Sequence, residues 1–488
     1  MPDRSSFSVR PSSWSRRDFL AGAGVGLGAA LGAAALGRTP WLEGPPRPAS
    51  LYEYFVDSYW MESSGLRSDP LRPPLRGAAK ADVAIVGGGF TGLATAIAVA
   101  RRQPERHVVV LEGARCGYGA SGRNGGFADT TYMGFPEFAA SHPPEEARAV
   151  FDAMATGLDA IERLVDADGL DIELERNGGL RLAASDHQIG LLERAHQALQ
   201  AIGLDSRLVD GAELRALVRT ERFRAGLVVP HTAILHPGKL ARGMARVAES
   251  LGVVIHEATR VLRIEPGRPV RLTGELGQLE ATQAVLATNG YSPQLGVHRQ
   301  RLLPICNYVV ATEPLSRAQW DAIGWAGRQG LSDARVLFMY LRPTRDGRIV
   351  AGGERAPYYK GSLPSSANHA QAIAQLQRSL VETFPPLAGV RFEHAWGGTM
   401  AFTRDFTPRI GPLEGRPNVW AGVGYCGEGV VMSQVAGRIL AAQLAGDGGE
   451  YGGLPFVGGR PPWVGPEPFR TVGVQAMERA LRALAGES

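Results

Sequence analysis

The distribution of apolar and polar positions predicts a strand–helix–strand unit near residue 80. The apolar run Ala81–Val86 ends at Gly87 and is typical of a buried parallel strand. Residues Gly92–Arg101 follow with apolar residues at helical spacing, and His107–Leu111 predicts a second strand. The unit spans about 30 residues, the usual length of a strand–helix–strand motif.

Further helices and strands are predicted in the middle of the chain. Amphipathic patterns predict helices at about 145–166 and near 187–202, which begin a second domain. A third helix is predicted over Gly238–Leu251. The apolar runs Val253–His256 and Gln283–Thr288 predict strands, so this stretch returns to the first domain.

The C-terminal third is predicted to be richer in strands. From 303 to about 395 the pattern favours strands, with turns at Asp346-Gly347 and Gly352-Gly353. A glycine-rich strand–turn–helix is predicted near 397–445, and the tail is predicted to be helical from about Val474.

An export signal is predicted at the N-terminus. Residues 15–20 read S-R-R-D-F-L, and 13 of the 19 uncharged residues Phe19–Gly37 are Gly or Ala. This pattern is typical of a twin-arginine signal. The alternative is a membrane span, which so many Gly and Ala residues disfavour. Because the twin-arginine route carries folded proteins, it implies a cofactor that is inserted before export.

This signal predicts a location outside the cytoplasm. We expect the twin-arginine export machinery to be a partner, and the protein to reach the periplasm or the cell exterior. An uncleaved signal would anchor the chain in the membrane, and a cytoplasmic location is the alternative.

Composition and charge exclude several classes of protein. The chain has 52 Lys and Arg residues against 48 Asp and Glu, and this near balance gives no electrostatic footprint for nucleic acid. A hydrophobic content of 44% excludes a wholly disordered chain. The three cysteines, Cys116, Cys306 and Cys426, are odd in number and widely spaced. They fit neither a disulfide framework nor a zinc site, and no metal site is predicted.

A glycine-rich turn joins the first predicted strand to the first helix. Residues 87–92 read G-G-G-F-T-G and contain the spacing G-x-G-x-x-G, and Glu112 ends the second strand. Gly87 allows a tight turn, Gly89 lets the backbone approach a pyrophosphate, and Gly92 permits close packing of strand and helix. The start of the helix offers N–H groups to the phosphates, and Glu112 is expected to bind the adenosine ribose. The sequence therefore predicts a dinucleotide site.

Three features favour FAD over NAD. The second strand runs into a loop of small residues with one Arg, residues 119–126, which suits a backbone wrapped around a pyrophosphate and flavin. Only one G-x-G-x-x-G lies between a predicted strand and helix. The run 422–430 opens a helix whose start could face the flavin and stabilise the negative charge of its reduced form. A glycine-rich turn before a packing helix is the alternative for this last run.

Several motifs together resemble the D-amino-acid-oxidase-like family of FAD-dependent oxidoreductases. The branch with gamma-glutamylputrescine-oxidase-like amine oxidases, related to sarcosine and glycine oxidases, fits best. The resemblance covers about 58–480 and rests on ADVAIVGGGFTGL (81–93), VVVLEGARCGYGASGRNGG (108–126), TAILHPGKLARGMA (232–245), VLATNGYSP (285–293), MYLRPTRDGRIVAGG (339–353), WGGTMAFTRDFTPRIGPL (396–413), NVWAGVGYCGEGVVMS (418–433) and Leu454–Arg460.

The resemblance implies an α/β fold in which a discontinuous Rossmann-like FAD-binding domain joins an α+β substrate domain built on an antiparallel sheet. The expected segments are the signal and linker 1–45, FAD-binding parts 46–130, 231–302 and 396–447, substrate-domain parts 131–230 and 303–395, and a C-terminal tail and helix, 448–488.

The resemblance also implies which residues contact FAD. Val261 is expected to contact the adenine through its backbone, Thr288 and Gly290 to pass near the pyrophosphate, and the turn before the last helix to lie at the flavin ring. The predicted cofactor residues are Gly87, Gly89, Phe90, Thr91, Gly92, Glu112, Ala114, Arg115, Ala120, Ser121, Gly122, Arg123, Asn124, Gly125, Gly126, Val261, Thr288, Gly290, Gly424, Gly427, Glu428, Gly429 and Val430.

Two departures from the family pattern change the expectations. Sarcosine oxidases attach their flavin through a Cys before a Met-Tyr pair, whereas this chain has Phe338 before Met339-Tyr340, so we expect FAD to be bound non-covalently. Where relatives often read G-Y-S-G-H-G, this chain has Cys426 and Glu428. Glu428 could lower the potential of the flavin or bind a cationic amine. A solvated Glu on a turn is the alternative.

The implied reaction transfers a hydride equivalent from the carbon beside a neutral amine to the flavin, and the resulting imine hydrolyses. The predicted substrate is an amine or amino acid. Tyr340 and Arg342 are the predicted catalytic, substrate-facing residues, and Arg342 could pair a substrate carboxylate. A structural Arg on a strand is the alternative. His236, Tyr308 and Trp396 are weaker candidates, because a lone His or aromatic residue is more often packing.

The sequence leaves open which molecule accepts the electrons from the flavin, and it allows two competing functions. Lys239 and Lys360, the lysines beyond the first strand, lie in no flavin motif, so both oxygen and another acceptor stay open. The competing functions are an NAD-linked dehydrogenase and a non-catalytic or partner-dependent flavoprotein subunit.

Overall fold

The computed structural model describes residues 57–335, 337–359, 369–449 and 451–484. Chain contacts divide it into two units: residues 47–464, and a second unit to which the tail from Gly465 belongs. The described part of the tail holds the helix α12 (Phe469–Leu484), which begins earlier than the Val474 predicted. The predicted signal and linker lie outside the described residues.

A mainly parallel sheet holds the predicted strand–helix–strand unit. Its strands run in the order β17–β18–β11–β1–β2–β8, and β10 and β9 continue antiparallel from β11. Strand β1 pairs in parallel with β2 and with β11, as the Rossmann-like prediction requires. The strands are β1 (Gly77–Val86), β2 (Val108–Leu111), β8 (Val254–His256), β9 (Val261–Glu265), β10 (Val270–Gly274), β11 (Gly277–Leu286), β17 (Arg409–Pro412) and β18 (Val419–Val423).

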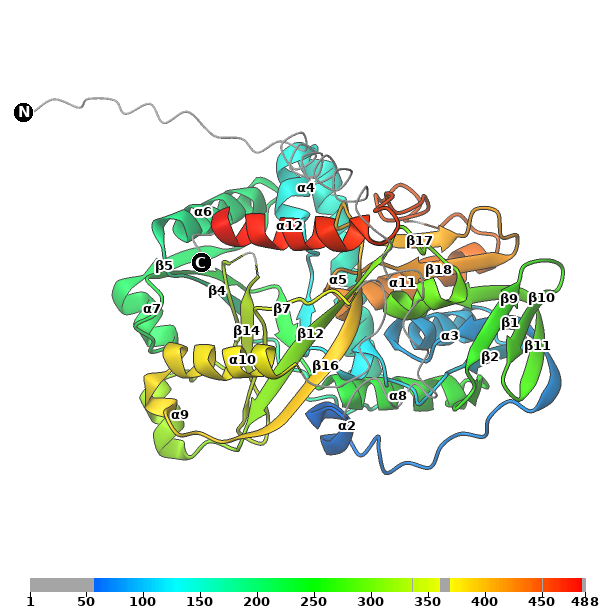
Figure 1. Ribbon diagram of the computed structural model, residues 1–488, viewed down its shortest axis with the longest axis horizontal. Coiled ribbons are helices and arrows are strands. Elements are labelled where there is room, and N and C mark those ends of the chain that lie inside the picture. The colour runs from blue at the N-terminus through cyan, green and yellow to red at the C-terminus, as the bar shows by residue number, and fades with distance from the viewer. Residues whose placement is uncertain (1–56, 336, 360–368, 450, 485–488) are drawn as a thin grey trace, which may run out of the picture. The chain divides into compact units, whose positions relative to one another are not determined.

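The last four residues of β1, Val83–Val86, are buried on both faces, which explains their apolar run. Val83 and Ile85 pack in the core with the helix α3 (Phe90–Arg102), while Ala84 and Val86 pack on the opposite face with β11. Alternate residues of a strand point to opposite faces, so a strand covered on both sides must be apolar throughout. Figure 1 shows α3 alongside this sheet.

A second, mainly antiparallel sheet lies in the same unit of the chain. Its order is β16–β12–β15–β14–β13–β4–β6–β5, and the pairs are antiparallel except β13–β4, which is parallel. The strands are β4 (Gly179–Ala183), β5 (Arg207–Asp210), β6 (Ala225–Val229), β12 (Leu303–Thr312), β13 (Gly330–Asp333), β14 (Met339–Pro343), β15 (Ile349–Gly353) and β16 (Phe392–Phe402). This sheet confirms the predicted fold class.

Two details of this sheet differ from the expectations. The predicted turn at Gly352-Gly353 was wrong, because both residues belong to β15, which ends at Gly353. Strand β16 pairs with β12 along its length and crosses the predicted boundary between residues 395 and 396. The division into domains itself stays a prediction.

A pair of short strands follows the predicted cofactor loop. Strand β3 (Phe127–Asp129) pairs antiparallel with β7 (Thr232–Ile234), and Asp129 stands opposite Thr232. Strand β3 also packs against α11. Strand β3 therefore connects the end of the loop 119–126 to the surface of α11 (Gly429–Leu444).

The helices of residues 57–464 fill the core and flank the sheets. The helices α9 and α10 were not anticipated in the stretch predicted to be strand-rich. The helices are α2 (Tyr59–Ser63), α3, α4 (Phe135–Ser141), α5 (Pro144–Asp166), α6 (Asp186–Ala201), α7 (Gly211–Leu217), α8 (Pro237–Ser250), α9 (Arg317–Ile323), α10 (Ala370–Thr383) and α11 (Gly429–Leu444), with single 3₁₀ turns or short 3₁₀ helices η3 (Ala120–Gly122), η4 (Asn289–Leu295) and η5 (Pro385–Leu387).

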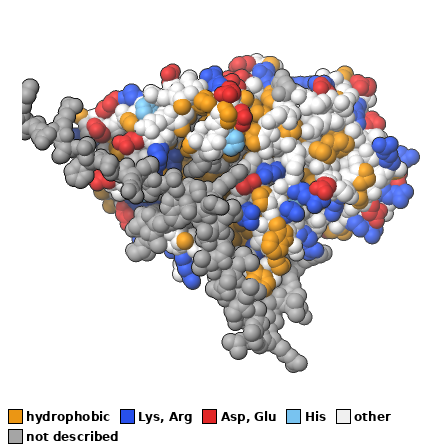
Figure 2. Space-filling view, turned by 90° about the horizontal axis from the view of Figure 1, so that it is seen from above, with side chains coloured by type: hydrophobic (Ala, Val, Ile, Leu, Met, Phe, Trp, Pro, Cys, Tyr) orange, Lys and Arg blue, Asp and Glu red, His pale blue; other side chains and the backbone are white. Residues whose placement is uncertain are grey.

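The helices of the described residues and the charges on one face bear on the kind of surface this chain presents. Within the ranges given above, every helix is too short or too polar to cross a bilayer. On the face seen in Figure 2, Lys and Arg lie interspersed with Asp and Glu.

Candidate active site

The glycine turn has the close packing that its sequence predicts. Gly87 has φ +109°, a conformation that side chains disfavour, and a Cβ there would lie 2.7 Å from the Ala287 carbonyl oxygen. A Cβ on Gly92 would overlap the carbonyl oxygen of Gly87. The turn therefore admits only glycine where the strand passes into α3.

The start of α3 has a glycine in place of a capping side chain. Its N-cap is Gly89, which supplies no side-chain cap, and a Cβ at Gly89 would lie 2.9 Å from the Ser121 Oγ. The Phe90 N–H donates to the same Ser121 Oγ at 2.9 Å. The Ser121 hydroxyl therefore accepts the first N–H of the helix, and the partial positive charge of the helix start suits a pyrophosphate.

Glu112 stands at the end of β2, against the glycine turn. Its carboxylate accepts hydrogen bonds from the Gly88 N–H at 2.7 Å and the Ala114 N–H at 2.9 Å. Burial raises the pKa of Glu112 to about 7, although these two N–H groups act in the opposite direction. This places an acceptor beside the helix start, where an adenosine ribose is expected.

The loop 119–126, called the flavin loop below, lies across the same turn. Within it, the Asn124 Nδ2 donates to the Ala120 and Ser121 carbonyls at 3.0 Å, and its Oδ1 accepts from the Gly126 N–H at 2.8 Å. The nearby Arg115 donates to the backbone carbonyls of Leu66 and Asp69. Hydrogen bonds within the loop thus stabilise its backbone conformation beside α3.

The C-terminal glycine-rich turn meets the first one. The Thr91 Oγ1 donates to the Tyr425 Oη at 2.8 Å, and the Gly424 N–H donates to the Asn289 Oδ1 at 3.0 Å. Gly424 and Gly427 have φ +80° and +106°. Helix α11 begins at Gly429 with Glu428 as N-cap and no side-chain cap. Two segments more than 300 residues apart therefore converge, as the FAD interpretation requires.

Thr288 and Gly290 lie close to the residues already described, whereas the side chain of Val261 packs in the core. Thr288 lies against the glycine turn, with its Cγ2 3.5 Å from a Cβ at Gly87, and Gly290 lies in η4 against Thr399. Val261 begins β9, and its side chain packs in the core. Its contact with adenine stays a prediction.

A carboxyl pair, Asp129 and Glu428, lies beside this convergence. Both side chains are half-buried, and burial raises the pKa of each, while the Asp129 charge raises that of Glu428 further. A hydrogen bond with Thr232 lowers the pKa of Asp129 in part. This partial burial favours a role for Glu428 over the solvated-turn alternative, and that role stays a prediction. Asp129 was missed, although an acidic residue closing the strand after the flavin loop was a visible signal.

Tyr340 lies against the flavin loop. A Cβ on Gly125 would lie 2.5 Å from its ring, and the ring packs edge-on against Phe127 with centroids 5.5 Å apart. Its Oη donates to the Asn307 Oδ1 at 3.5 Å, and the side chain is half-buried. Its position is compatible with a substrate-facing role, which stays a prediction.

Arg342 has the surroundings of a structural residue. It is 0% exposed, its Nε donates to the Pro343 carbonyl at 2.9 Å, and its Nη1 donates to the carbonyls of Leu235 and Gly126. Burial lowers the pKa of this guanidinium to about 10. These contacts favour the structural alternative over pairing with a substrate carboxylate.

The weaker candidates also have structural contacts. The His236 Nδ1 accepts from the Lys239 N–H at 3.1 Å and so caps α8. The Tyr308 and Tyr359 hydroxyls lie 2.6 Å apart, and the Trp396 Nε1 donates to the Arg123 carbonyl at 2.9 Å. The three cysteines are buried thiols, and the described residues contain no cluster of three metal-ligating side chains.

The residues present fit FAD. The start of α3 at Gly89, the glycines that leave no room for a Cβ, the Glu112 carboxyl and the flavin loop adjoin one another. They supply a helix start for phosphates and an acceptor for a ribose, and α11 adds a helix start without a side-chain cap.

Comparisons with known proteins agree with this geometry. The family model described as "FAD dependent oxidoreductase" matches residues 82–443. The gamma-glutamylputrescine oxidoreductase of Escherichia coli is 30% identical over 78% of this chain and 88% of its own length. A probable oxidoreductase of Haemophilus influenzae is 28% identical over 81% and 90%. The crystal structure of glycine oxidase from Geobacillus kaustophilus has a TM-score of 0.67 at 21% identity, over 78% of this chain and 98% of that one, and shows the same fold.

Proposed function

The chain belongs to the FAD-dependent oxidoreductase family, and from this premise we propose that it oxidises the carbon–nitrogen bond of an amine or amino acid. Bound FAD would supply the acceptor for a hydride equivalent from the carbon next to nitrogen. The imine product would then hydrolyse. The substrate class is supported by the relatives, among them a gamma-glutamylputrescine oxidoreductase and a glycine oxidase.

The observation that carries this proposal is the convergence of the two glycine-rich turns. The Thr91–Tyr425 hydrogen bond joins the start of α3 to the turn before α11, with the Ser121 hydroxyl of the flavin loop against the same helix start. The α3 start and Glu112 would hold the adenosine diphosphate part of the cofactor. The α11 start would favour negative charge at the other end.

The carboxyl pair Asp129 and Glu428 would recognise the substrate nitrogen. Amines are cationic at neutral pH, whereas hydride loss needs the neutral amine. A carboxylate whose pKa is raised by burial is a better proton acceptor than an exposed one. We therefore assign this pair two steps: binding the ammonium, then accepting one of its protons so that the nitrogen lone pair is free.

Anaerobic mixing tests the proposal. The purified yellow protein is mixed with a panel of monoamines, diamines and amino acids while the flavin absorbance near 450 nm is followed, and oxygen is then admitted. Bleaching by at least one member, with aldehyde, keto acid or imine formed, is expected. Absence of bleaching across the panel would overturn the substrate assignment.

The same experiment separates the alternatives. Return of the colour in oxygen identifies an oxidase, and return only with a quinone or dye identifies a dehydrogenase. A protein that holds FAD but reacts only after co-purification with a partner would be a flavoprotein subunit. Turnover of a nicotinamide without bound flavin would establish an NAD-linked dehydrogenase.

Non-covalent attachment of the cofactor is a further part of the proposal. Phe338 precedes Met339-Tyr340 where sarcosine oxidases carry a Cys, and the Phe338 and Tyr340 rings lie 6.3 Å apart. Acid precipitation should therefore leave all flavin in the supernatant. Yellow colour in the pellet would contradict this.

Export by the twin-arginine route is also part of the proposal. It is supported by the S-R-R-D-F-L run and by the uncharged stretch that follows it. Replacing the pair Arg16 and Arg17 by Lys should retain the protein in the cytoplasm, whereas Arg4→Lys and Arg10→Lys should not. Export of the twin-lysine variant at the wild-type level would contradict this route.

A further inference from the structure

Three consecutive carbonyl groups of the flavin loop are each held by a side chain from a distant segment. The donors come from the N-terminal end of the described chain and from β16. They are Ser58 Oγ to the Gly122 carbonyl at 2.5 Å, Trp396 Nε1 to the Arg123 carbonyl at 2.9 Å and Trp60 Nε1 to the Asn124 carbonyl at 2.8 Å. The flavin loop is thus held by side chains from outside it.

These donors are buried, so water cannot replace them. Ser58 is 1% exposed, and Trp60 and Trp396 are 0% exposed. The two indole rings pack edge to face with centroids 6.4 Å apart. Loss of one indole N–H would leave a buried carbonyl without its partner, which costs more than loss of an exposed hydrogen bond.

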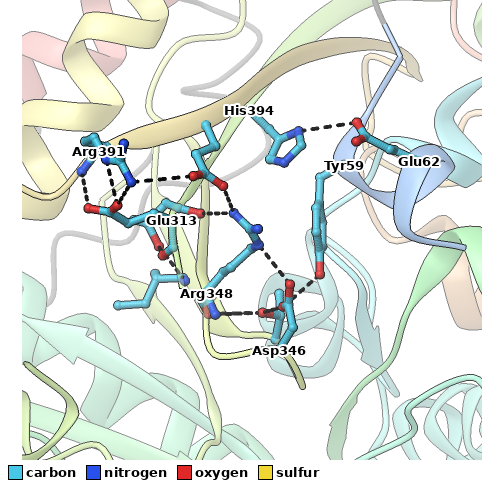
Figure 3. A network of polar contacts seen from close by, with 11 residues as sticks. Tyr59, Glu62, Glu313, Asp346, Arg348, Arg391 and His394 are labelled. Atoms are coloured by element: carbon cyan, nitrogen blue, oxygen red, sulfur yellow. Dashed lines mark hydrogen bonds and ion pairs between the residues drawn. The ribbon is translucent and has the colours of Figure 1, made fainter. Parts of the chain in front are cut away.

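Helix α2, which carries Trp60, also contacts the turn between β14 and β15 of the second sheet. The Tyr59 Oη donates to the Asp346 Oδ1 at 2.8 Å, and Arg348 lies over the Tyr59 ring at 5.5 Å. Arg348 in turn pairs with Asp346 at 2.8 Å and with Glu393 at 2.5 Å. Figure 3 shows this network leading from Tyr59 to the strands.

Helix α2 is also tied to α8. The Ser63 Oγ and the His236 Nε2 lie 3.0 Å apart, and His236 caps α8 through its other ring nitrogen. A Cβ on Gly238 would overlap the Trp60 carbonyl oxygen, so the two helices are in direct contact. Although it has only five residues, α2 therefore contacts three other segments: the flavin loop, the turn between β14 and β15, and α8.

We propose that Ser58, Trp60 and Trp396 are positioning residues that clamp the flavin loop in the conformation that binds FAD. A loop that is already ordered loses less conformational entropy on binding, so the clamp raises affinity without touching the cofactor. The inference rests on FAD binding at this loop and is independent of the identity of the amine.

Trp60→Phe and Trp396→Phe test the clamp. Each keeps an aromatic ring and removes the indole N–H. The matched control is Trp325→Phe, because Trp325 is 2% exposed and its Nε1 donates to the Gln329 carbonyl at 3.0 Å, away from the loop. Flavin is removed from each purified holoenzyme, and the Kd for FAD is measured by titration of flavin fluorescence.

We expect the Kd for FAD to rise about 3- to 10-fold in each of the two clamp variants, the size of one lost buried hydrogen bond. Trp325→Phe should keep the wild-type Kd even if its melting temperature falls. Because the defect is in affinity, saturating FAD should restore full flavin occupancy and the wild-type visible spectrum.

Two outcomes would overturn the clamp: wild-type Kd in both clamp variants, or an equal rise in all three Trp variants. If a Trp variant does not fold, Ser58→Ala, which removes the donor to Gly122, takes its place with the same expectation. The readout is FAD binding, so a failure to oxidise any amine would leave this result unaffected.

Discussion

His236 illustrates how surrounding groups decide the protonation state and the role of a residue that could act as an acid or base. Its Nδ1 accepts the Lys239 N–H, so the neutral ring carries its proton on Nε2, which faces the Ser63 hydroxyl. Burial and the nearby cation Arg342 lower the pKa of His236 to about 3. The residue is therefore neutral in the folded protein and serves as a helix cap.

This depressed pKa predicts a specific loss of stability in mild acid. Below the unfolded pKa of about 6.5, only the unfolded state takes up a proton at this ring, so the free energy of unfolding falls as pH drops from about 6.5 toward 3. The expected loss due to His236 is about 1 kcal/mol between pH 7 and pH 5.5.

Denaturant unfolding of His236→Asn at both pH values measures this effect. Asn keeps a capping acceptor but does not titrate, so the variant should lose about 1 kcal/mol less than wild type. His187→Asn, on the exposed face of α6, should behave as wild type. Equal pH dependence in wild type and His236→Asn would contradict the assignment.

The proposed role of Asp129 and Glu428 predicts that the KM for a cationic amine depends on pH. Glu428→Gln should raise the KM for a cationic amine about 10-fold, the size of one charge-assisted hydrogen bond of ~1.5–2 kcal/mol, with FAD content unchanged. In wild type the KM should fall as pH rises, because a carboxyl with raised pKa loses its proton only at higher pH.

The pH profile of KM across pH 6–9 tests this prediction. Glu428→Gln should flatten the profile, Asp129→Asn should have a similar effect, and Glu265→Gln on β9, a partly exposed carboxylate, should change neither quantity. A wild-type KM and profile in Glu428→Gln would place the ammonium elsewhere.

At the scale of elements, the same substitution should have opposite effects in two helices. Alanine stabilises a helix interior relative to glycine by roughly 0.5–1 kcal/mol. Gly190→Ala in α6 meets only the Arg194 Nη1, at 3.5 Å, and should be neutral or stabilising. Gly92→Ala in α3 would drive its Cβ into the Gly87 carbonyl oxygen, which belongs to the backbone and cannot move aside.

We therefore expect Gly92→Ala to lose most bound FAD and to lower the melting temperature. The ratio of absorbance at 450 nm to that at 280 nm in purified protein measures occupancy, and thermal unfolding measures stability. Wild-type FAD occupancy in Gly92→Ala would show that the glycine turn accommodates a Cβ at this position and would contradict the proposed role of Gly92.

Elements with a strong local pattern were predictable from the sequence. The strand–helix–strand unit is predictable because the end of β1, α3 and β2 carry clear apolar patterns, and because the spacing of Gly87, Gly89 and Gly92 has a specific steric meaning. The turn predicted at Gly352-Gly353 failed for a physical reason. A Cβ at Gly352 would overlap the Tyr340 hydroxyl, so this glycine makes room for a side chain within a strand.

The residues that sequence reasoning missed depend on contacts between distant segments. No local pattern shows that Trp60 and Trp396 donate to adjacent carbonyls of one loop, or that Asp129 meets Glu428. The surroundings of Arg342 were hidden for a similar reason: alternation places it on one face of β14, but only the fold shows that it donates to the Leu235 and Gly126 carbonyls, and its substrate-facing role stays a prediction. Local periodicity predicts elements, whereas packing between them assigns side-chain roles.

At the scale of the whole molecule, the flavin loop links the two sheets. Its Ser121 hydroxyl accepts a hydrogen bond from the start of α3, which packs on the first sheet. Its Arg123 carbonyl accepts one from Trp396 of β16, which belongs to the second sheet. A ligand that binds only the folded state stabilises it by RT ln(1 + [L]/Kd), about 4 kcal/mol at 1,000 times Kd. FAD should therefore stabilise both sheets together, because ordering this loop engages contacts to each.

Hydrogen exchange of the apoprotein with and without FAD tests this coupling. Peptides that cover β2 and α3 should gain protection, and so should peptides from β12 and β16 in the second sheet, by amounts that rise with FAD concentration. In Trp396→Phe the gain in the second sheet should shrink while that in α3 persists, because the lost hydrogen bond lies between the loop and β16. Protection confined to the first sheet in wild type would show that the loop responds to FAD without engaging the second sheet, and the linkage between the sheets would then be absent.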